Sequence, residues 1–142
     1  MIIALKYRNL KYRNLRNNIS RKMIGKILLV DDAPFMRMML KKILAPSGNE
    51  LIEAADGSDG VSKYKQHRPD LVFLDIMMPH VDGIECLKQI MAHDSNAKVI
   101  ICGSIGQQTL VNEAIKIGAG DYIIKPFDAA KVLEILCKNM PG

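Results

Sequence analysis

Short apolar runs alternate with segments of helical periodicity along most of this 142-residue chain, and this alternation restricts the fold more than any other feature. Runs that are apolar at consecutive positions are typical of strands buried on both faces. Apolar residues spaced three or four apart, as in Met36, Met39 and Leu40, indicate amphipathic helices between them. The predicted strands are Lys26–Val30, Glu50–Ala54, Leu71–Leu74, Lys98–Cys102 and Asp121–Ile124.

Strict alternation of five strands with five helices predicts an α/β protein with a parallel sheet. Right-handed crossovers then give a doubly wound (βα)5 three-layer sandwich. Five units are too few for an eight-stranded barrel. Pro34 is well placed for the first turn of one helix, and Asp128 for the N-cap of the last.

The net charge of +5 is concentrated at the N-terminus. The first 22 residues hold seven of the 20 basic residues and none of the 15 acidic ones, so residues 23–142 carry a net charge of −2. Residues 6–15 repeat KYRNL, a low-complexity pattern that matches neither helical nor strand periodicity. We expect residues 1–22 to be a basic extension, mobile or non-native, and residues 23–142 to form the domain. The alternative is an arm that binds RNA, DNA or acidic lipid. For the domain itself we expect no nucleic-acid binding.

Three cysteines, Cys86, Cys102 and Cys137, are far apart and form no CxxC pair. An odd, scattered set argues against a disulfide framework or a zinc site and is typical of a reducing cytoplasm. No run approaches the roughly 18 apolar residues of a membrane span. We therefore expect a cytoplasmic protein without a membrane span.

Several polar residues stand at the C-terminal ends of the predicted strands, where open parallel sheets bind their ligands. They are Asp31 and Asp32 after the first strand, Asp75 after the third, Gly103 and Ser104 after the fourth, and Lys125 after the fifth. Each feature alone is more often structural, since acids at strand ends often cap the next helix. Their conjunction at one edge predicts a site.

Three carboxylates in one pocket repel one another and raise each other's pKa, and a divalent cation resolves this conflict. Hard oxygen ligands without a nearby His or Cys favour Mg²⁺ or Mn²⁺ over zinc. Lys125 adds a second cation that can pair with a carboxylate or a phosphoryl group. These groups predict phosphoryl chemistry with Asp75 as the nucleophile.

Four segments resemble the receiver domain of two-component response regulators: KILLVDDAPFMRMML, PDLVFLDIMMPHVDG, KVIICGSIGQQ and GAGDYIIKPFD. Together they cover essentially all of residues 24–140. The segments VDDAPFMR and GQQ most resemble chemotaxis receivers of the CheY type. The resemblance implies a flavodoxin-like fold with strand order 2-1-3-4-5, and a signalling phosphoacceptor whose only activities are its own phosphorylation and dephosphorylation.

The resemblance also implies roles for the site residues. Asp75 would accept the phosphoryl group from a phosphohistidine of a sensor histidine kinase. Asp32, Asp75 and the backbone carbonyl of Met77 would bind Mg²⁺ directly, and Asp31 would act largely through a metal-bound water. Lys125 would contact the phosphoryl group, and its peptide bond to the following proline would be cis.

Tyr122 matches the aromatic switch position of the family. The face around it, from the fourth helix to the fifth, would bind a flagellar-motor or adaptor protein. One departure is that Gly103 stands where the family has Ser or Thr, with Ser104 next to it. Either Ser104 substitutes after a backbone adjustment, which Gly103 would permit, or the coupling of hydroxyl to aromatic ring is weakened. We favour weakened coupling, and Ser restored at position 103 should strengthen the response.

Met77 and Ile105 stand two residues after Asp75 and Gly103, at positions that flank the path of the hydrolytic water in the family. Both are apolar here, which predicts slow self-dephosphorylation and a use for an auxiliary phosphatase.

The chain stops after the last predicted helix, so we expect a stand-alone receiver whose output comes from another protein. One alternative is a phosphorelay intermediate that passes its phosphoryl group to a histidine phosphotransfer protein. Another is a haloacid-dehalogenase-like phosphatase, although that family has DxD where this chain has the adjacent pair Asp31-Asp32.

Overall fold

The structure, a computed structural model, describes residues 13–14, 25–78 and 82–140. The predicted extension over residues 1–22 lies outside these ranges, apart from residues 13–14. In chain order the elements of the domain are β1 (Lys26–Val30), α2 (Pro34–Leu44), the 3-10 helix η1 (Ala45–Ser47), β2 (Glu50–Ala54), α3 (Gly57–His67), β3 (Leu71–Asp75), α4 (Gly83–His93), β4 (Val99–Gly103), α5 (Gln108–Ile117), β5 (Asp121–Ile124) and α6 (Ala129–Asn139).

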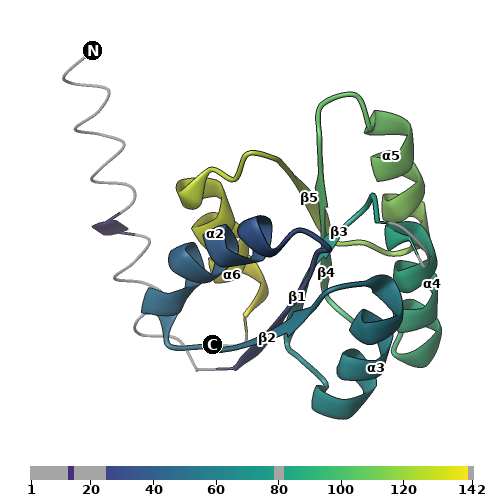
Figure 1. Ribbon diagram of the computed structural model, residues 1–142, viewed down its shortest axis with the longest axis horizontal. Coiled ribbons are helices and arrows are strands. Elements are labelled where there is room, and N and C mark those ends of the chain that lie inside the picture. Colours follow the sequence, from purple (N-terminus) through teal and green to yellow (C-terminus); the bar gives the residue numbers. More distant parts are fainter. Residues whose placement is uncertain (1–12, 15–24, 79–81, 141–142) are drawn as a thin grey trace.

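The five strands form one parallel sheet in the order β2-β1-β3-β4-β5 (Figure 1). This confirms the predicted fold class and strand order. The chain first moves outward from β1 to β2 and then returns to place β3 on the other side of β1. The ends of β1 and β3 therefore adjoin at the point where the strand order reverses, which is where such sheets bind ligands.

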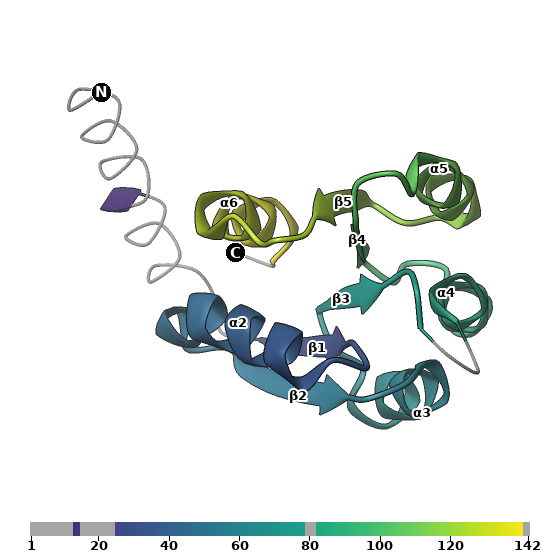
Figure 2. The same cartoon turned by 45° about the horizontal axis from the view of Figure 1, so that its top comes forward.

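Helices cover both faces of the sheet, α2 and α6 on one and α3, α4 and α5 on the other (Figures 1 and 2). Successive side chains of a strand point to opposite faces. In β1, Leu28 and Val30 therefore pack in the core under α3 to α5, whereas Ile27 and Leu29 pack in the core under α2 and α6. Two separate cores explain why the strands are apolar at consecutive positions.

The helix signals in the sequence are confirmed where the structure describes them. Pro34 lies in the first turn of α2. Asp128 caps α6 by accepting a hydrogen bond from the Ala130 N–H at 2.9 Å. Among the described residues, no helix is long and apolar enough to cross a bilayer.

The predicted fourth strand, Lys98–Cys102, is wrong by one residue at each end, because β4 runs from Val99 to Gly103. Gly103 pairs with Ile124, and its carbonyl accepts a hydrogen bond from the Lys125 N–H at 2.7 Å. The ladder to β5 thus extends β4 to include Gly103, which the sequence placed after the strand.

Candidate functional site

Three carboxylates gather where β1 and β3 end. Asp31 and Asp32 follow β1 directly, and Asp75 is the last residue of β3. One oxygen from each carboxylate lies within 4.8 Å of the other two. Asp31 and Asp75 are only 2% and 6% exposed, whereas Asp32 is exposed. The acidic cluster is therefore a buried pair of acids with a third acid at its mouth.

Lys125 reaches the cluster from the end of β5. Its Nζ donates a hydrogen bond to Oδ2 of Asp31 at 2.8 Å and lies 3.5 Å from Oδ2 of Asp75. The Lys125-Pro126 bond is cis, as the resemblance implied. Three acids and one lysine, predicted from the ends of three separate strands, thus lie together at one edge.

Hydrogen bonds between backbone and side-chain groups fix the two buried acids. Oδ1 of Asp31 accepts a hydrogen bond from the Ala33 N–H at 2.9 Å, and Arg37 donates to the Asp31 carbonyl. Oδ1 of Asp75 accepts from the Met77 N–H at 3.2 Å. Met77 thus contacts Asp75 through its backbone, although the residue is 55% exposed.

The pKa values of Asp75 and Lys125 are both higher than usual. Burial raises the pKa of Asp75 to about 6, and the negative charge of Asp31 adds to this rise, while Lys125 opposes it. Burial alone would lower the pKa of Lys125, but the hydrogen bond to Asp31 and the charge of Asp75 outweigh burial and raise it. The lysine therefore stays charged beside an anion that gains stability from further positive charge.

The donor set of the cluster fits a hard divalent cation. It offers carboxylate oxygens, which are the ligands that Mg²⁺ and Mn²⁺ prefer. Both oxygens of Asp31 already accept hydrogen bonds, from Ala33 and Lys125. Asp32 and Asp75 therefore have more free acceptor capacity, in keeping with an outer role for Asp31.

The three predicted switch residues occupy different places. Gly103 is the last residue of β4, and its carbonyl accepts a hydrogen bond from the Lys125 N–H. Ser104 is exposed in the following loop, and its N–H donates to Oε1 of Gln107 at 2.7 Å. Tyr122 lies on the edge strand β5 with 40% of its surface exposed.

Sequence reasoning assigned no role to Gln107 or Gly83. The spacing Ser-x-x-Gln from Ser104 to Gln107 is a recognisable signal for a side chain that returns to a backbone N–H. At Gly83, an added Cβ would lie 2.3 Å from the carbonyl oxygen of Asp75 and 2.5 Å from the Cα of Ile76. Glycine lets α4 begin in direct contact with the backbone at the end of β3.

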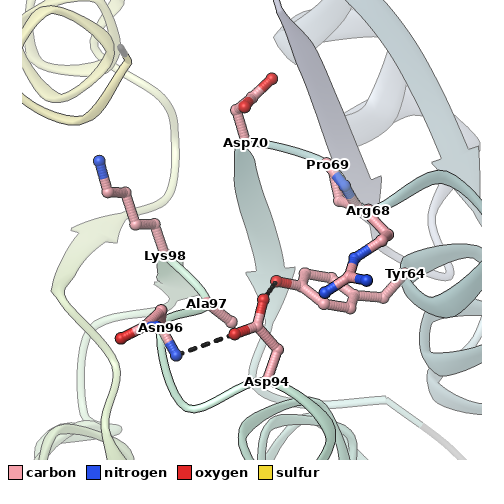
Figure 3. A pocket seen from close by; sticks show the side chains of 8 residues that line it. All are labelled: Tyr64, Arg68, Pro69, Asp70, Asp94, Asn96, Ala97 and Lys98. Carbon is pink, nitrogen blue, oxygen red and sulfur yellow. Dashed lines mark hydrogen bonds between the residues drawn. The ribbon is translucent and has the colours of Figure 1, made fainter.

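A separate pocket of about 290 Å³ lies at the opposite edge of the sheet, where β3 and β4 begin (Figure 3). Within it the Tyr64 hydroxyl donates to Oδ2 of Asp94 at 2.7 Å, and the Asn96 N–H donates to Oδ1 at 3.0 Å. The pocket is lined by Tyr64, Arg68, Pro69, Asp70, Asp94, Asn96, Ala97 and Lys98. It lies away from the acidic cluster and takes no part in the chemistry proposed below.

Comparison with known proteins gives matches along most of the chain. The profile of the response regulator receiver domain matches residues 27–137. Chemotaxis protein CheY of Bacillus subtilis is 51% identical over 119 residues, which are 83% of this chain and 99% of that protein. Sporulation initiation phosphotransferase F of the same organism is 35% identical over 116 residues, 82% of this chain and 94% of that protein. A chain of the CheX-CheY-BeF3-Mg²⁺ complex from Borrelia burgdorferi superimposes with a TM-score of 0.75 at 43% identity, covering 80% of this chain and 87% of that chain.

Proposed function

The chain belongs to the response regulator receiver domain family, and from this premise we propose that it accepts a phosphoryl group on Asp75 from a histidine kinase in a Mg²⁺-dependent reaction. The observation that carries the proposal is the position of Asp75. Its carboxylate is 6% exposed, lies in a cluster with two other acids, and has the ammonium of Lys125 at 3.5 Å.

In the proposed reaction, a carboxylate oxygen of Asp75 forms a bond to phosphorus as the P–N bond of a phosphohistidine breaks. The leaving imidazole takes a proton from solvent, so neutral histidine and an aspartyl phosphate result. Lys125 is close enough to balance charge on the transferred oxygens, since positioning and charge neutralisation dominate such transfers. The Met77 N–H holds one Asp75 oxygen and so orients the carboxylate.

Asp32, Asp75 and the Met77 carbonyl are the proposed direct ligands of Mg²⁺, or of Mn²⁺ in its place, with Asp31 acting through water. A bound divalent cation would supply positive charge against the acids and free positions for phosphoryl oxygens. The residues of this chain hold the acceptor and exclude water from two of the three acids.

Phosphoramidate tests this proposal, because it carries the same type of P–N bond as phosphohistidine. With Mg²⁺ it should give a ³¹P signal of an acyl phosphate that hydroxylamine removes. Asp75→Asn should give none, whereas Asp59→Asn, a matched change on the surface of α3, should behave as wild type. An undiminished acyl phosphate signal in Asp75→Asn contradicts the assignment of the acceptor.

For output we propose partner binding in chemotaxis signalling, at the face formed by α5, β5 and α6. Ile115 on α5 and Tyr122 on β5 are large apolar side chains that remain 42% and 40% exposed there. A hollow of about 440 Å³ lies between β5 and the start of α6. The proposed partner is a flagellar-motor or adaptor protein, and such a partner implies a cytoplasmic location. The test is whether the phosphorylated chain retains that partner.

The second candidate is a phosphorelay intermediate, favoured by the likeness to sporulation initiation phosphotransferase F. Transfer of the label from Asp75 to a histidine phosphotransfer protein would support the relay. Capture of a motor or adaptor protein without such transfer would support chemotaxis. The family match leaves the haloacid-dehalogenase-like phosphatase without support, and turnover of a phosphomonoester is not expected.

We also propose that the aspartyl phosphate hydrolyses slowly and that an auxiliary phosphatase removes it. The side chains of Met77 and Ile105 are apolar and 55% and 88% exposed, so they offer no hydrogen bond to an attacking water. Met77→Asn should shorten the lifetime of the phosphoryl group, and an unchanged lifetime would count against this proposal.

A further inference from the structure

The side chain of Gln107 lies against the space that Gly103 leaves open. A Cβ added to Gly103 would lie 3.1 Å from Oε1 of Gln107 and 3.5 Å from Cγ2 of Ile76. The first of these distances is tighter than an ordinary van der Waals contact, so a larger residue would push the carboxamide aside. Glycine at the end of β4 therefore allows Gln107 its observed position.

From this position Gln107 closes the loop that leaves β4. Its Oε1 accepts the Ser104 N–H at 2.7 Å, and its own N–H donates to the Ser104 carbonyl at 3.3 Å. The arrangement is half of a capping box. However, α5 begins only at Gln108, and Gly106 has a φ of +95° between the two partners. The hydrogen bond from Ser104 to Gln107 therefore stabilises the loop before α5 rather than the first turn of α5.

The Ser104 N–H stands at the edge where the acidic cluster lies. In the sheet register Cys102 is opposite Asp75, so Ser104 lies two residues beyond the point where β4 passes Asp75. On the side of β5, the carbonyl of Gly103 accepts a hydrogen bond from the Lys125 N–H. Ser104 is thus the first residue to leave the strand that lies between the proposed acceptor and its lysine.

A phosphoryl group on Asp75 competes with the Gln107 side chain for the hydrogen bond from the Ser104 N–H. It brings charge and three acceptor oxygens. Hydrogen bonds to a charged acceptor are about twice as strong as neutral ones. The carboxamide of Gln107 is neutral and is tied to an exposed loop, so it is the weaker acceptor of the two.

We propose that Gln107 is a positioning residue that holds the Ser104 N–H until a phosphoryl group on Asp75 takes its place. Release of the Gln107 side chain then frees the loop 104–107, and this loop carries the response in a chain whose Gly103 has no hydroxyl to move. The inference rests on the proposed phosphorylation of Asp75.

The test uses ¹⁵N-labelled full chain, before and after treatment with acetyl phosphate and Mg²⁺, with intact mass recorded on each sample. Before treatment, Gln107→Ala should move the Ser104 amide proton upfield and speed its exchange with solvent about fivefold. Gln107→Glu keeps an acceptor oxygen and should restore the Ser104 signal. The matched control is Gln108→Ala, because the neighbouring Gln108 side chain donates to Asn112 on the surface of α5 and should leave Ser104 unchanged.

After treatment of wild type, the Ser104 amide should stay hydrogen-bonded while the side-chain NH2 of Gln107 becomes mobile. In Gln107→Ala, phosphorylation should proceed about two- to fivefold faster, because no bond to Ser104 has to break first. A gain of about 80 Da with unchanged Gln107 signals overturns this inference alone and leaves Gln107 as a loop brace. No gain of mass in wild type overturns the proposed function, and this inference with it.

Discussion

The ammonium of Lys125 lies 2.8 Å from the carboxylate of Asp31, and their side chains are only 15% and 3% exposed. The pair joins the ends of β1 and β5, two strands separated in the sheet by β3 and β4. The lysine is therefore already directed at the acidic cluster, where it also lies 3.5 Å from Asp75.

Lys125→Met should destabilise the protein in the absence of divalent cations, because it leaves buried acids without their cation. We expect the free energy of unfolding to fall by about 2 kcal/mol, below the full value for a buried pair since Lys125 is partly exposed. Urea unfolding in a chelator measures this loss, and added Mg²⁺ should restore part of it. Lys138→Met is the control, because Lys138 lies 3.9 Å from Glu134 on an exposed surface and should cost less than about 0.5 kcal/mol. Equal losses in the two variants would contradict this account of the lysine.

Asp32→Asn should distinguish two effects of Asp32, its repulsion of Asp75 and its binding of Mg²⁺. The charge of Asp32 helps to raise the pKa of Asp75, so its removal should leave the cation-free protein as stable as wild type or slightly more so. The affinity for Mg²⁺ should nevertheless fall about tenfold or more, because an exposed ligand is lost. Thermal unfolding at increasing Mg²⁺ concentration measures both effects. Asp59→Asn is the control, and a Mg²⁺ response in Asp32→Asn that equals wild type excludes Asp32 as a ligand.

Gly83→Ala should disturb the end of β3 from outside the acidic cluster. The new Cβ would overlap the Asp75 carbonyl, so α4 has to shift, at a cost of about 2–3 kcal/mol in the free energy of unfolding. Gly120→Ala is the matched control, because the nearest atom to its Cβ is 3.9 Å away, at the Val99 carbonyl. Denaturant unfolding compares the two, and similar small losses would show that the close approach at Gly83 is not required.

The sequence predicted the strands and helices well because two buried faces and clear caps leave strong periodic signals. It also predicted which side chains meet at the acidic cluster, since parallel strands bring their C-terminal ends to one edge. It missed contacts that depend on the path of a loop or a helix. The bond from Gln107 to Ser104 requires the turn at Gly106, and the approach of Gly83 requires the docked position of α4. The pair Tyr64 and Asp94 is 30 residues apart and has no periodic signature.

Tyr64→Phe should change how stability depends on pH at the edge opposite the acidic cluster. The Tyr64 hydroxyl is the main cause of the lowered pKa of Asp94, with the Asn96 N–H second. A lowered folded-state pKa stabilises the protein above the ordinary Asp value of 3.8, and this contribution is lost as the pH falls through the lowered value. Wild type should therefore exceed Tyr64→Phe in stability at neutral pH, and the difference should shrink below pH 4.

Two measurements check this prediction. NMR titration should place the carboxyl pKa of Asp94 higher in Tyr64→Phe than in wild type. Tyr122→Phe, which removes a hydroxyl from the exposed edge strand, should leave the Asp94 titration unchanged. An Asp94 pKa that is the same in all three proteins would refute the assigned cause.

The most direct measurement for the account is the intact mass of the chain after treatment with acetyl phosphate and Mg²⁺. Wild type should gain about 80 Da, the mass of one phosphoryl group, and Asp75→Ala should gain nothing. The chelated sample should also show no gain, since the acids then lack their divalent cation. A gain that persists in Asp75→Ala, or a wild type that stays unmodified with Mg²⁺ present, would contradict the central claim that Asp75 is the phosphoacceptor of this domain.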